Sequence, residues 1–290
     1  MTLMQIIWDA NPVIFTLGPI APRWYGLMFA IGFTLGYWIV ARMFKHEGAP
    51  ESWLGSLLIY IVVATLVGAR LGHVFFYEWD VYSKHPLDIL KIWEGGLASH
   101  GGTIAIIIAL FLWSWIVSKK PASWVFDKIV IPIALVGGLI RLGNLFNSEI
   151  YGSYTDLPWG FIFVRNGETM PAHPTQLYEA GCYFLLFILL MWMYWKKNCE
   201  ERPWLITGVF FIGIFLPRFF IEYVKNVQVS SEYAMIAKYG LNMGQALSIP
   251  FILIGVFLII WAMTHPKVKF DFPNKFPPEP DKKEKKNKKK

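Results

Sequence analysis

The residues best suited to chemistry lie in an otherwise apolar stretch from Gly137 to Gly152, G-G-L-I-R-L-G-N-L-F-N-S-E-I-Y-G. The stretch begins like a membrane-spanning helix, yet it carries four polar residues, Arg141, Asn144, Asn147 and Glu149. A charged side chain at the centre of a membrane span costs about 2.5–3.5 kcal/mol on insertion scales. That cost indicates a pathway, a ligand site or a partner. The simplest alternative is an Arg–Glu pair that only packs helices together.

The composition of the chain is that of a membrane protein. Of its 290 residues, 55% are hydrophobic and only 16% are charged, whereas soluble domains average about 25% charged residues. Much of the net charge of +7 comes from the tail K-K-E-K-K-N-K-K-K, residues 282–290. Beside a final transmembrane helix, such a tail marks the cytoplasmic side and attracts anionic membrane lipids. We therefore expect no nucleic-acid partner.

Seven stretches of about 20 mostly apolar residues are long enough to cross a bilayer. They predict an all-α polytopic membrane protein, with its membrane domain over residues 1–265. The third stretch is the shortest. The expected spans are roughly 24–44, 53–79, 102–118, 124–146, 176–195, 204–224 and 244–264.

The distribution of lysine and arginine predicts the orientation of these spans. Basic residues gather where the first, third, fifth and seventh spans end, whereas the opposite connections are more dilute in them. Because cytoplasmic loops carry the excess of basic residues, the N-terminus is expected outside and the C-terminus in the cytoplasm.

Three segments outside the spans have recognisable character. Residues 80–100 contain I-W-E-G-G-L, whose Ile92, Trp93 and Leu97 suit the membrane interface. Residues 147–175 contain F-I-F-V followed by R-N-G-E, a pattern typical of a strand and a hairpin turn, and predict a small extracytoplasmic cap. Residues 266–290 are rich in proline and lysine and predict a disordered cytoplasmic tail.

With this orientation, the polar residues of the spans fall at one depth, toward the outer leaflet. Arg141 and Asn144 share a helix face, as do Arg218 and Glu222, because residues three or four apart are neighbours on a helix. The residues expected at this depth are Tyr25, Arg70, His73, His100, Arg141, Asn144, Glu149, His173, Arg218 and Glu222.

A phospholipid headgroup is the ligand that fits such a set. Arg70, Arg141 and Arg218 offer planar, permanently charged groups suited to phosphate. The sequence H-G-G, starting at His100, opens a helix whose free backbone N–H groups favour an anion. The alternative for the glycines is close helix packing. A strand followed by a phosphate loop, a metal-ligand spacing and a G-x-S-x-G motif are all absent from the sequence, which makes a water-soluble substrate the weaker interpretation.

These motifs, in this order, resemble the prolipoprotein diacylglyceryl transferase family. The likeness runs from W-Y-G-L-M at Trp24 to M-G-Q-A-L-S-I-P, which ends at Pro250. Between them lie G-A-R-L-G, H-G-G, the long block from Gly137, H-P-T-Q-L-Y-E-A and R-F-F-I-E. The block from Gly137 to Gly152 is similar to the family's signature.

The resemblance implies a bacterial cytoplasmic (inner) membrane enzyme that acts in lipoprotein biosynthesis. It would transfer the diacylglyceryl group of phosphatidylglycerol to the lipobox cysteine of a prolipoprotein signal peptide, release glycerol phosphate and need no cofactor. Arg141 and Arg218 would then stabilise the charge of the departing phosphate. His100 would either accept the thiol proton or hydrogen-bond to the lipid, and the sequence leaves both roles open.

The remaining motif positions are expected to hold the headgroup or to support the arginines. Glu222 would orient Arg218, and Gly152 would let the backbone pass close to the lipid or the cap. The substrate-binding residues expected from the resemblance are Tyr25, Arg70, Arg141, Asn144, Asn147, Glu149, Gly152 and Glu222.

The sequence also departs from the family pattern at a few positions. Arg23 stands where many members have a histidine, and Ile214 stands where familiar members have a tyrosine. If that tyrosine served in proton transfer, another group must do so here. Two other functions remain as alternatives: a lipid or anion transporter, whose polar residues would continue to the cytoplasmic side, and a non-catalytic membrane scaffold, which would tolerate replacement of Arg141 and His100.

Overall fold

The computed structural model describes residues 6–18, 20–197, 199–226 and 231–272. Among these residues, seven helices are long and apolar enough to cross a membrane, as expected from the sequence. The chain is therefore a multi-pass membrane protein. The membrane-spanning stretches are Trp24–Glu47, Glu51–Phe76, Ser99–Ser118, Ala122–Phe146, Thr175–Lys197, Leu205–Val224 and Met243–Thr264.

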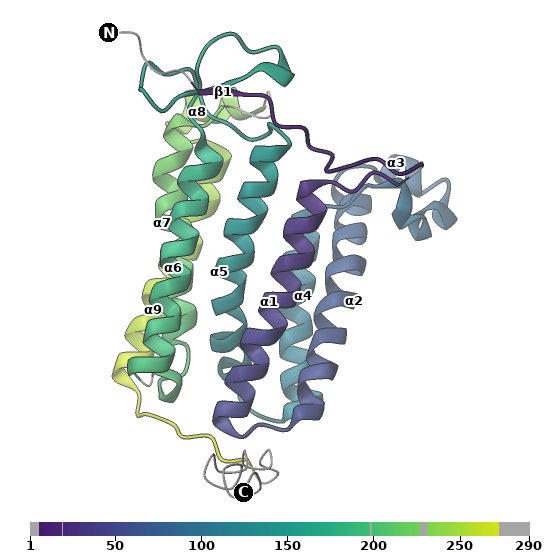
Figure 1. Ribbon diagram of the computed structural model, residues 1–290. Coiled ribbons are helices and arrows are strands. Elements are labelled where there is room, and N and C mark those ends of the chain that lie inside the picture. The colour runs from purple at the N-terminus through teal and green to yellow at the C-terminus, as the bar shows by residue number, and fades with distance from the viewer. Residues whose placement is uncertain (1–5, 19, 198, 227–230, 273–290) are drawn as a thin grey trace, which may run out of the picture. The chain divides into compact units, whose positions relative to one another are not determined.

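These spans are formed by seven long helices, two of which are prolonged by a different helical turn (Figure 1). The third span begins at Ser99, three residues earlier than expected, so that His100 lies in its first turn. The long helices are α1 (Trp24–Glu47), α2 (Glu51–Phe76), α4 (Ser99–Trp113, continued by a π-helix at Ser114–Ser118), α5 (Ala122–Phe146), α6 (Thr175–Lys197), α7 (Leu205–Ile221, continued by a 3-10 helix at Glu222–Val224) and α9 (Met243–Thr264).

Shorter elements connect them. They are β1 (Ile6–Trp8), α3 (Trp79–Tyr82), β2 (Phe161–Phe163), α8 (Ser231–Tyr239) and 3-10 helices at Pro86–Leu90, Ile92–Glu94, Val164–Asn166 and Cys199–Glu201.

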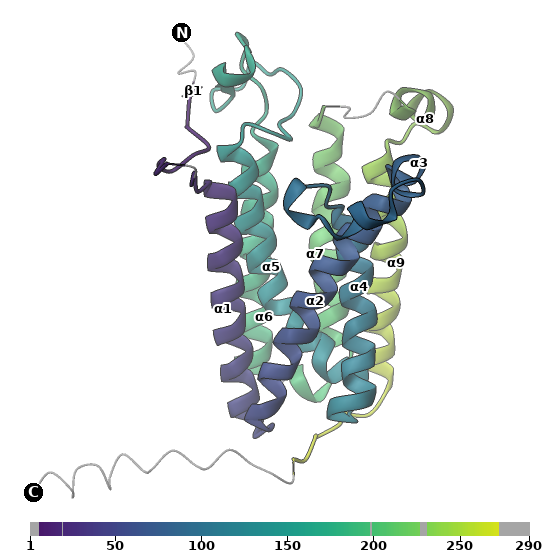
Figure 2. The same ribbon diagram turned by 90° about the vertical axis from the view of Figure 1, so that its right-hand side faces the viewer.

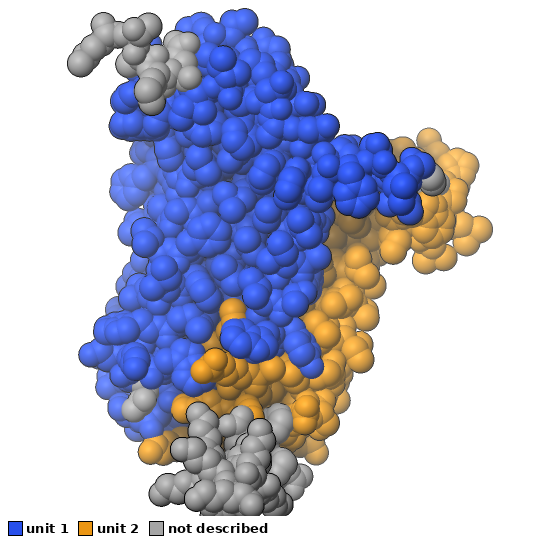
Figure 3. Space-filling model, in the orientation of Figure 1, with its two compact units in different colours: residues 1–38, 127–268 blue, residues 39–126, 269–290 orange. Residues whose placement is uncertain are grey.

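The chain divides into two compact units, coloured separately in Figure 3. The first unit comprises residues 1–38 and 127–268, and the second comprises residues 39–126 and 269–290. Helices α1 and α5 each contribute residues to both units.

In the first unit, α7 lies between α6 and α9 and contacts both (Figure 2). Glycines let α7 and α9 approach closely: a Cβ atom added to Gly208 would lie 2.9 Å from the carbonyl oxygen of Gly255. Small residues at such contacts are the usual means of packing helices in membranes.

The N-terminus of α7 is held by a buried carboxylate on α5. Asp127 accepts hydrogen bonds from the backbone N–H groups of Trp204 (2.7 Å) and Thr207 (2.8 Å), and from the Thr207 hydroxyl (2.6 Å). A helix N-terminus leaves backbone N–H groups unsatisfied, and its dipole favours a negative charge. Asp127 therefore joins α5 to α7 within the first unit.

The segment between α5 and α6 packs against the N-terminal strand. Strand β2 pairs in parallel with β1, with Ile6 opposite Phe161 and Trp8 opposite Phe163. The Trp8 indole donates a hydrogen bond to the carbonyl of Leu145 (2.9 Å). The turn expected at R-N-G-E is present, but β2 has β1 as its partner and meets the returning segment only at an isolated bridge to Ala172.

In the second unit, α2 and α4 run side by side (Figure 2). Their contact is made by backbone: a Cβ atom added to Gly72 would lie 2.6 Å from the Cα of Gly101. In the same unit Phe272, the last described residue, is buried beside the rings of Trp53 and Trp124. The rest of the expected tail, residues 273–290, lies outside the described residues.

Replacing Asp127 by alanine is expected to lower the free energy of unfolding by about 3 kcal/mol, because three donors would lose a charged acceptor. Thermal unfolding in detergent measures the effect. Asp156→Ala is the matched control, because Asp156 is exposed. Equal melting temperatures for the two variants would show that Asp127 does not stabilise α7.

Candidate functional site

Arg141 and Asn144 begin a series of side-chain hydrogen bonds at the end of α5. The Arg141 guanidinium donates a hydrogen bond to Asn144 Oδ1 (3.3 Å), and Asn144 Nδ2 donates to Glu149 Oε1 (2.7 Å). Asn147 Nδ2 donates to the same oxygen (3.2 Å). The polar residues of the signature block therefore act on one another, and Glu149 accepts from both asparagines.

The chain turns sharply after α5 to make this possible. Ser148 and Ile150 both have positive φ angles, 55° and 61°, a conformation that is costly for a β-branched residue such as isoleucine. The first turn of α6 holds the turn in place: Gln176 donates to the carbonyl of Glu149 (2.7 Å) and Thr175 to that of Ile150 (2.8 Å). The strained turn is therefore fixed by buried side chains of another helix.

Gly152 follows this turn at a point of close backbone approach. A Cβ atom there would lie 2.8 Å from His173 Cβ and 2.9 Å from Thr175 Cγ2, and it would also collide with the carbonyl oxygen of Val224. The residue is buried. Glycine is therefore needed for packing here.

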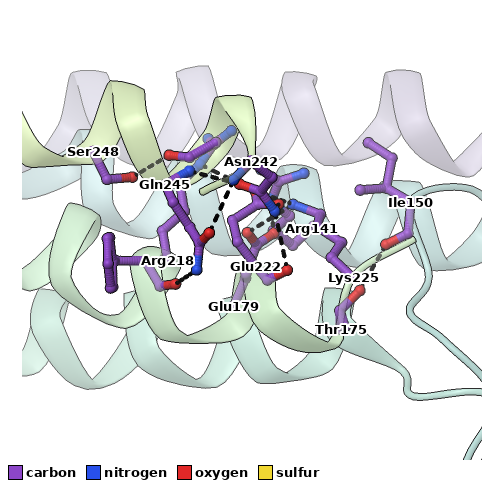
Figure 4. Close-up of polar contacts among 12 residues, drawn as sticks. Arg141, Ile150, Thr175, Glu179, Arg218, Glu222, Lys225, Asn242, Gln245 and Ser248 are labelled. Atoms are coloured by element: carbon purple, nitrogen blue, oxygen red, sulfur yellow. Dashed lines mark hydrogen bonds and ion pairs between the residues drawn. The ribbon is translucent and has the colours of Figure 1, made fainter. Parts of the chain in front are cut away.

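A second set of charges links α5, α6 and α7 (Figure 4). Arg141 Nε lies 2.5 Å from Glu179 Oε2, and Lys225 Nζ lies 3.2 Å from Glu179 Oε1 and 3.1 Å from Glu222 Oε1. Arg218 Nε lies 3.6 Å from Glu222 Oε1. The side chains therefore alternate in sign from Arg141 to Arg218, and we call these five residues the charge chain.

The charge chain is most deeply buried at its centre. The side chains of Glu179 and Lys225 are 1% and 4% exposed, whereas that of Arg218 is 32% exposed. Glu179 Oε2 makes no hydrogen bond among the described residues, so its contact with Arg141 is an ion pair without hydrogen-bond alignment. Buried charges are tolerated only when they are paired in this way.

The start of α9 supports the Glu222 end of the charge chain. Asn242 caps α9 through a reciprocal pair of hydrogen bonds with Gln245, and its Nδ2 also donates to the backbone carbonyl of Glu222 (3.2 Å). A Cβ atom on Gly244 would lie 2.5 Å from the Glu222 carboxyl carbon. The M-G-Q motif therefore lets α9 begin directly against Glu222 (Figure 4).

Tyr25 also belongs to this part of the first unit. Its ring covers Gly143 of α5, where an added Cβ atom would lie 2.8 Å from Tyr25 Cδ2. The first unit thus brings together several of the expected site residues. They are Tyr25, Arg141, Asn144, Asn147, Glu149, Gly152, Arg218 and Glu222.

Arg70 lies in the second unit and has different partners. Its side chain is buried, and it donates hydrogen bonds to the backbone carbonyls of Asp88 (2.6 Å), Ile89 (2.8 Å) and Gly95 (2.7 Å). The guanidinium thus fastens residues 88–96 to α2. Ile92, Trp93 and Leu97, which were expected at the membrane interface, are exposed.

His100 also lies in the second unit, in the first turn of α4. Its side chain is exposed and makes no hydrogen bond with any other described residue. The adjacent Gly101 packs on the backbone of Gly68 and Gly72 in α2. The backbone at His100 is therefore held against α2, while the imidazole itself is free of partners in the part of the chain described.

The segment between Gly152 and α6 holds two further polar clusters. Tyr151 and Tyr154 each donate to Glu168 (2.6 Å), and these hydrogen bonds lower the pKa of the Glu168 carboxyl. His173 Nδ1 lies 3.1 Å from the Tyr178 hydroxyl, and burial lowers the pKa of its imidazole. His173 is therefore neutral near pH 7.

Sequence reasoning assigned no role to several residues at the centre of the site. Glu179 lies within the motif H-P-T-Q-L-Y-E-A, and Lys225 lies among the dilute basic residues of the connections expected outside. The signal that points to Glu179 is an ionisable residue inside a membrane span, which is rare without a function. Lys225 lies three residues after Glu222, a spacing that allows a local ion pair. Its contact with Glu179 joins segments far apart in the sequence, and no local pattern indicates it.

Known proteins resemble this chain over most of its length. The profile of the family described as prolipoprotein diacylglyceryl transferase matches residues 12–261. Three relatives bear the name phosphatidylglycerol–prolipoprotein diacylglyceryl transferase. That of Porphyromonas gingivalis is 52% identical over 92% of this chain and 98% of its own. That of Chloroherpeton thalassium is 46% identical over 89% and 94%, and that of Tolumonas auensis is 45% identical over 88% and 97%.

The match to the family profile, residues 12–261, includes all the motifs described above, from Trp24 to Pro250. The chain therefore belongs to the prolipoprotein diacylglyceryl transferase family.

Proposed function

We propose that this enzyme transfers the diacylglyceryl group of phosphatidylglycerol to the cysteine thiol of a prolipoprotein lipobox. The observation that carries the proposal is the pair of arginines at the two ends of the charge chain. Arg218 has only Glu222 as a hydrogen-bond or ion-pair partner among the described residues, at 3.6 Å through Nε. Its Nη groups are therefore available to a phosphate, which guanidinium groups bind well.

The reaction forms one bond and breaks another. The cysteine sulfur attacks the glyceryl carbon that bears the phosphate, and a thioether bond forms. The bond between this carbon and the phosphate oxygen breaks, and its electron pair leaves with glycerol phosphate. Because negative charge grows on the departing phosphate, Arg141 and Arg218 stabilise the transition state more than the ground state.

The thiol proton needs an acceptor, because the thiolate is the nucleophile. We assign this role to His100. Histidine is the side chain that most often serves as a general base. The exposed position of His100, without a described partner, leaves its ring nitrogens available to a substrate.

The other site residues position the headgroup and the arginines. We assign Tyr25, Asn144, Asn147 and Glu149 to the headgroup, and Glu222 to the orientation of Arg218. Arg70 was expected at the headgroup as well, but its donors are engaged by the carbonyls of residues 88–96. We therefore assign it the task of holding that segment.

The membrane setting follows from the substrates and from the basic residues. We place the enzyme in the cytoplasmic (inner) membrane of a bacterium, with the N-terminus outside and the basic C-terminus in the cytoplasm. Phosphatidylglycerol and the signal peptide then meet in the outer leaflet. Residues 147–175 form the extracytoplasmic cap, and no nucleic acid takes part.

The direct test uses purified enzyme in detergent with phosphatidylglycerol and a lipobox peptide. Mass spectrometry is expected to show the diacylglyceryl adduct on the peptide cysteine, together with released glycerol phosphate. A peptide with serine in place of cysteine gives neither product. If the wild-type enzyme, shown to be folded, gives neither product with the cysteine peptide, the proposed function is wrong.

Arg141→Ala is expected to lower the transfer rate at least about a hundredfold, because the departing phosphate loses a charged partner. Arg165→Ala is the matched control, since Arg165 pairs with Asp9 at the surface, and it is expected to retain full activity. Undiminished transfer by folded Arg141→Ala enzyme would contradict the assignment.

His100→Gln is expected to reduce transfer at pH 7 about a hundredfold or more, because glutamine keeps a hydrogen-bonding side chain but accepts no proton. The loss is expected to shrink as the pH approaches about 8.5, where the peptide thiol ionises without help. The pH profile of the transfer rate measures this. A loss that is the same at every pH would assign His100 to hydrogen bonding with the lipid instead.

Gly152→Ala is expected to lower both the melting temperature and the transfer rate, since the methyl group would push His173 and Thr175 away from the turn after α5. Gly181→Ala is the matched control, because a methyl group there meets open space within α6. Thermal unfolding and the adduct assay report the two effects. Identical behaviour of the two variants would argue against close packing at Gly152.

A further inference from the structure

Lys225 occupies the centre of the charge chain. It follows the 3-10 helix that extends α7, and its Nζ atom lies within 3.2 Å of one oxygen from Glu179 and one from Glu222. Its side chain is only 4% exposed. The backbone at this point is also fixed, because Lys225 forms a β-bridge with Gly152.

The partners of Lys225 each hold an arginine. Glu179 contacts Arg141, and Glu222 contacts Arg218 (Figure 4). Three cations and two carboxylates leave the charge chain with one net positive charge. The charge chain therefore favours a negatively charged ligand beside it. This requires that the carboxylates neutralise the two terminal arginines only in part.

Without the lysine, this balance changes. Both carboxylates approach the same Nζ atom, so they lie close to one another and repel when that charge is removed. Each would then be drawn toward its own arginine, and the charge chain would become two neutral pairs. An arginine that is fully paired with a carboxylate has less to offer a phosphate.

We propose that Lys225 is a positioning residue that keeps Arg141 and Arg218 available to the phosphate of the lipid substrate. It does so by contacting Glu179 Oε1, the oxygen that does not contact Arg141, and by sharing Glu222 Oε1 with Arg218. The inference rests on the proposed function, because it specifies how the headgroup site of that reaction is held. Lys225 itself is too deeply buried to contact the lipid without rearrangement.

The first test compares Lys225→Met with Lys225→Arg. Lys225→Met is expected to raise the KM for phosphatidylglycerol about tenfold or more, the order of effect of one unit charge in partly buried surroundings. The KM for the lipobox peptide is expected to stay unchanged. Lys225→Arg keeps the charge and is expected to retain a KM for the lipid within about threefold of the wild type.

The second test is a double-mutant cycle between positions 179 and 225. Glu179→Gln with Lys225→Met removes one charge of each sign and restores the net charge of the chain. The double variant is therefore expected to bind the lipid better than Lys225→Met alone, with a KM that moves back toward the wild-type value. Two substitutions that act independently would instead multiply their effects.

Controls separate a loss of positioning from a loss of folding. Lys84→Met removes an exposed lysine of the second unit and is expected to change neither KM. The folded fraction of each variant is measured by size-exclusion chromatography and thermal unfolding. A fall in kcat that matches the folded fraction, with both KM values unchanged, would overturn the inference and leave Lys225 with a purely structural role.

The same assay distinguishes the two proposals. If the wild-type enzyme forms no adduct, the proposed function fails. If the wild type forms the adduct and Lys225→Met has the same KM for phosphatidylglycerol, the proposed function stands and the role of Lys225 is wrong.

Discussion

The cost of placing ionised side chains where water is scarce is the constraint on which this structure depends. Removing one partner from a buried ion pair costs about 3–5 kcal/mol, because the other charge is then left without compensation. The first unit meets this constraint by alternation: Arg141, Glu179, Lys225, Glu222 and Arg218 each contact a residue of opposite sign. The exposure of the side chains increases from the centre of the charge chain toward Arg218. Arg218 is therefore the charge that costs least to leave partly unpaired, and it is also the most accessible to a ligand.

The surrounding fold brings these side chains of opposite sign into contact. The carboxylates and cations come from α5, α6, α7, the short helix after α7 and the residue that follows it. These elements must therefore approach one another closely at one end. Gly152 and Gly244 allow backbone to pass beside His173 and Glu222, where any side chain would collide. The unfavourable φ angles at Ser148 and Ile150 are held by hydrogen bonds from α6. Motif positions without a reactive side chain, the glycines and the turn residues, are thus the ones that bring the ionised groups together.

The sequence predicted the membrane-spanning helices to within a few residues, because apolar length is a property of a contiguous segment and does not depend on tertiary contacts. It also singled out Arg141, Asn144 and Glu149, whose hydrogen bonds to one another join residues a few positions apart. It assigned no role to Lys225, since that role depends on Glu179 of α6 as well as on the nearby Glu222. Strand β2 was expected in a hairpin, but its partner is the N-terminal segment, more than 150 residues away. Local pattern contains no information about such a distant pairing.

The contact between Gly101 and the backbone of α2 has a consequence for how His100 moves. The atoms of α2 nearest to Gly101 belong to the backbone. Flexible side chains, which could rearrange to let the first turn of α4 move relative to α2, are absent from this contact. The backbone of His100 is thereby held against a neighbouring helix, while the residue itself is exposed. Its mobility is reduced to rotation about two side-chain bonds, which takes picoseconds to nanoseconds at an exposed position. The ring can therefore sample alternative rotamers many times during the lifetime of a bound substrate, without any helix having to rearrange.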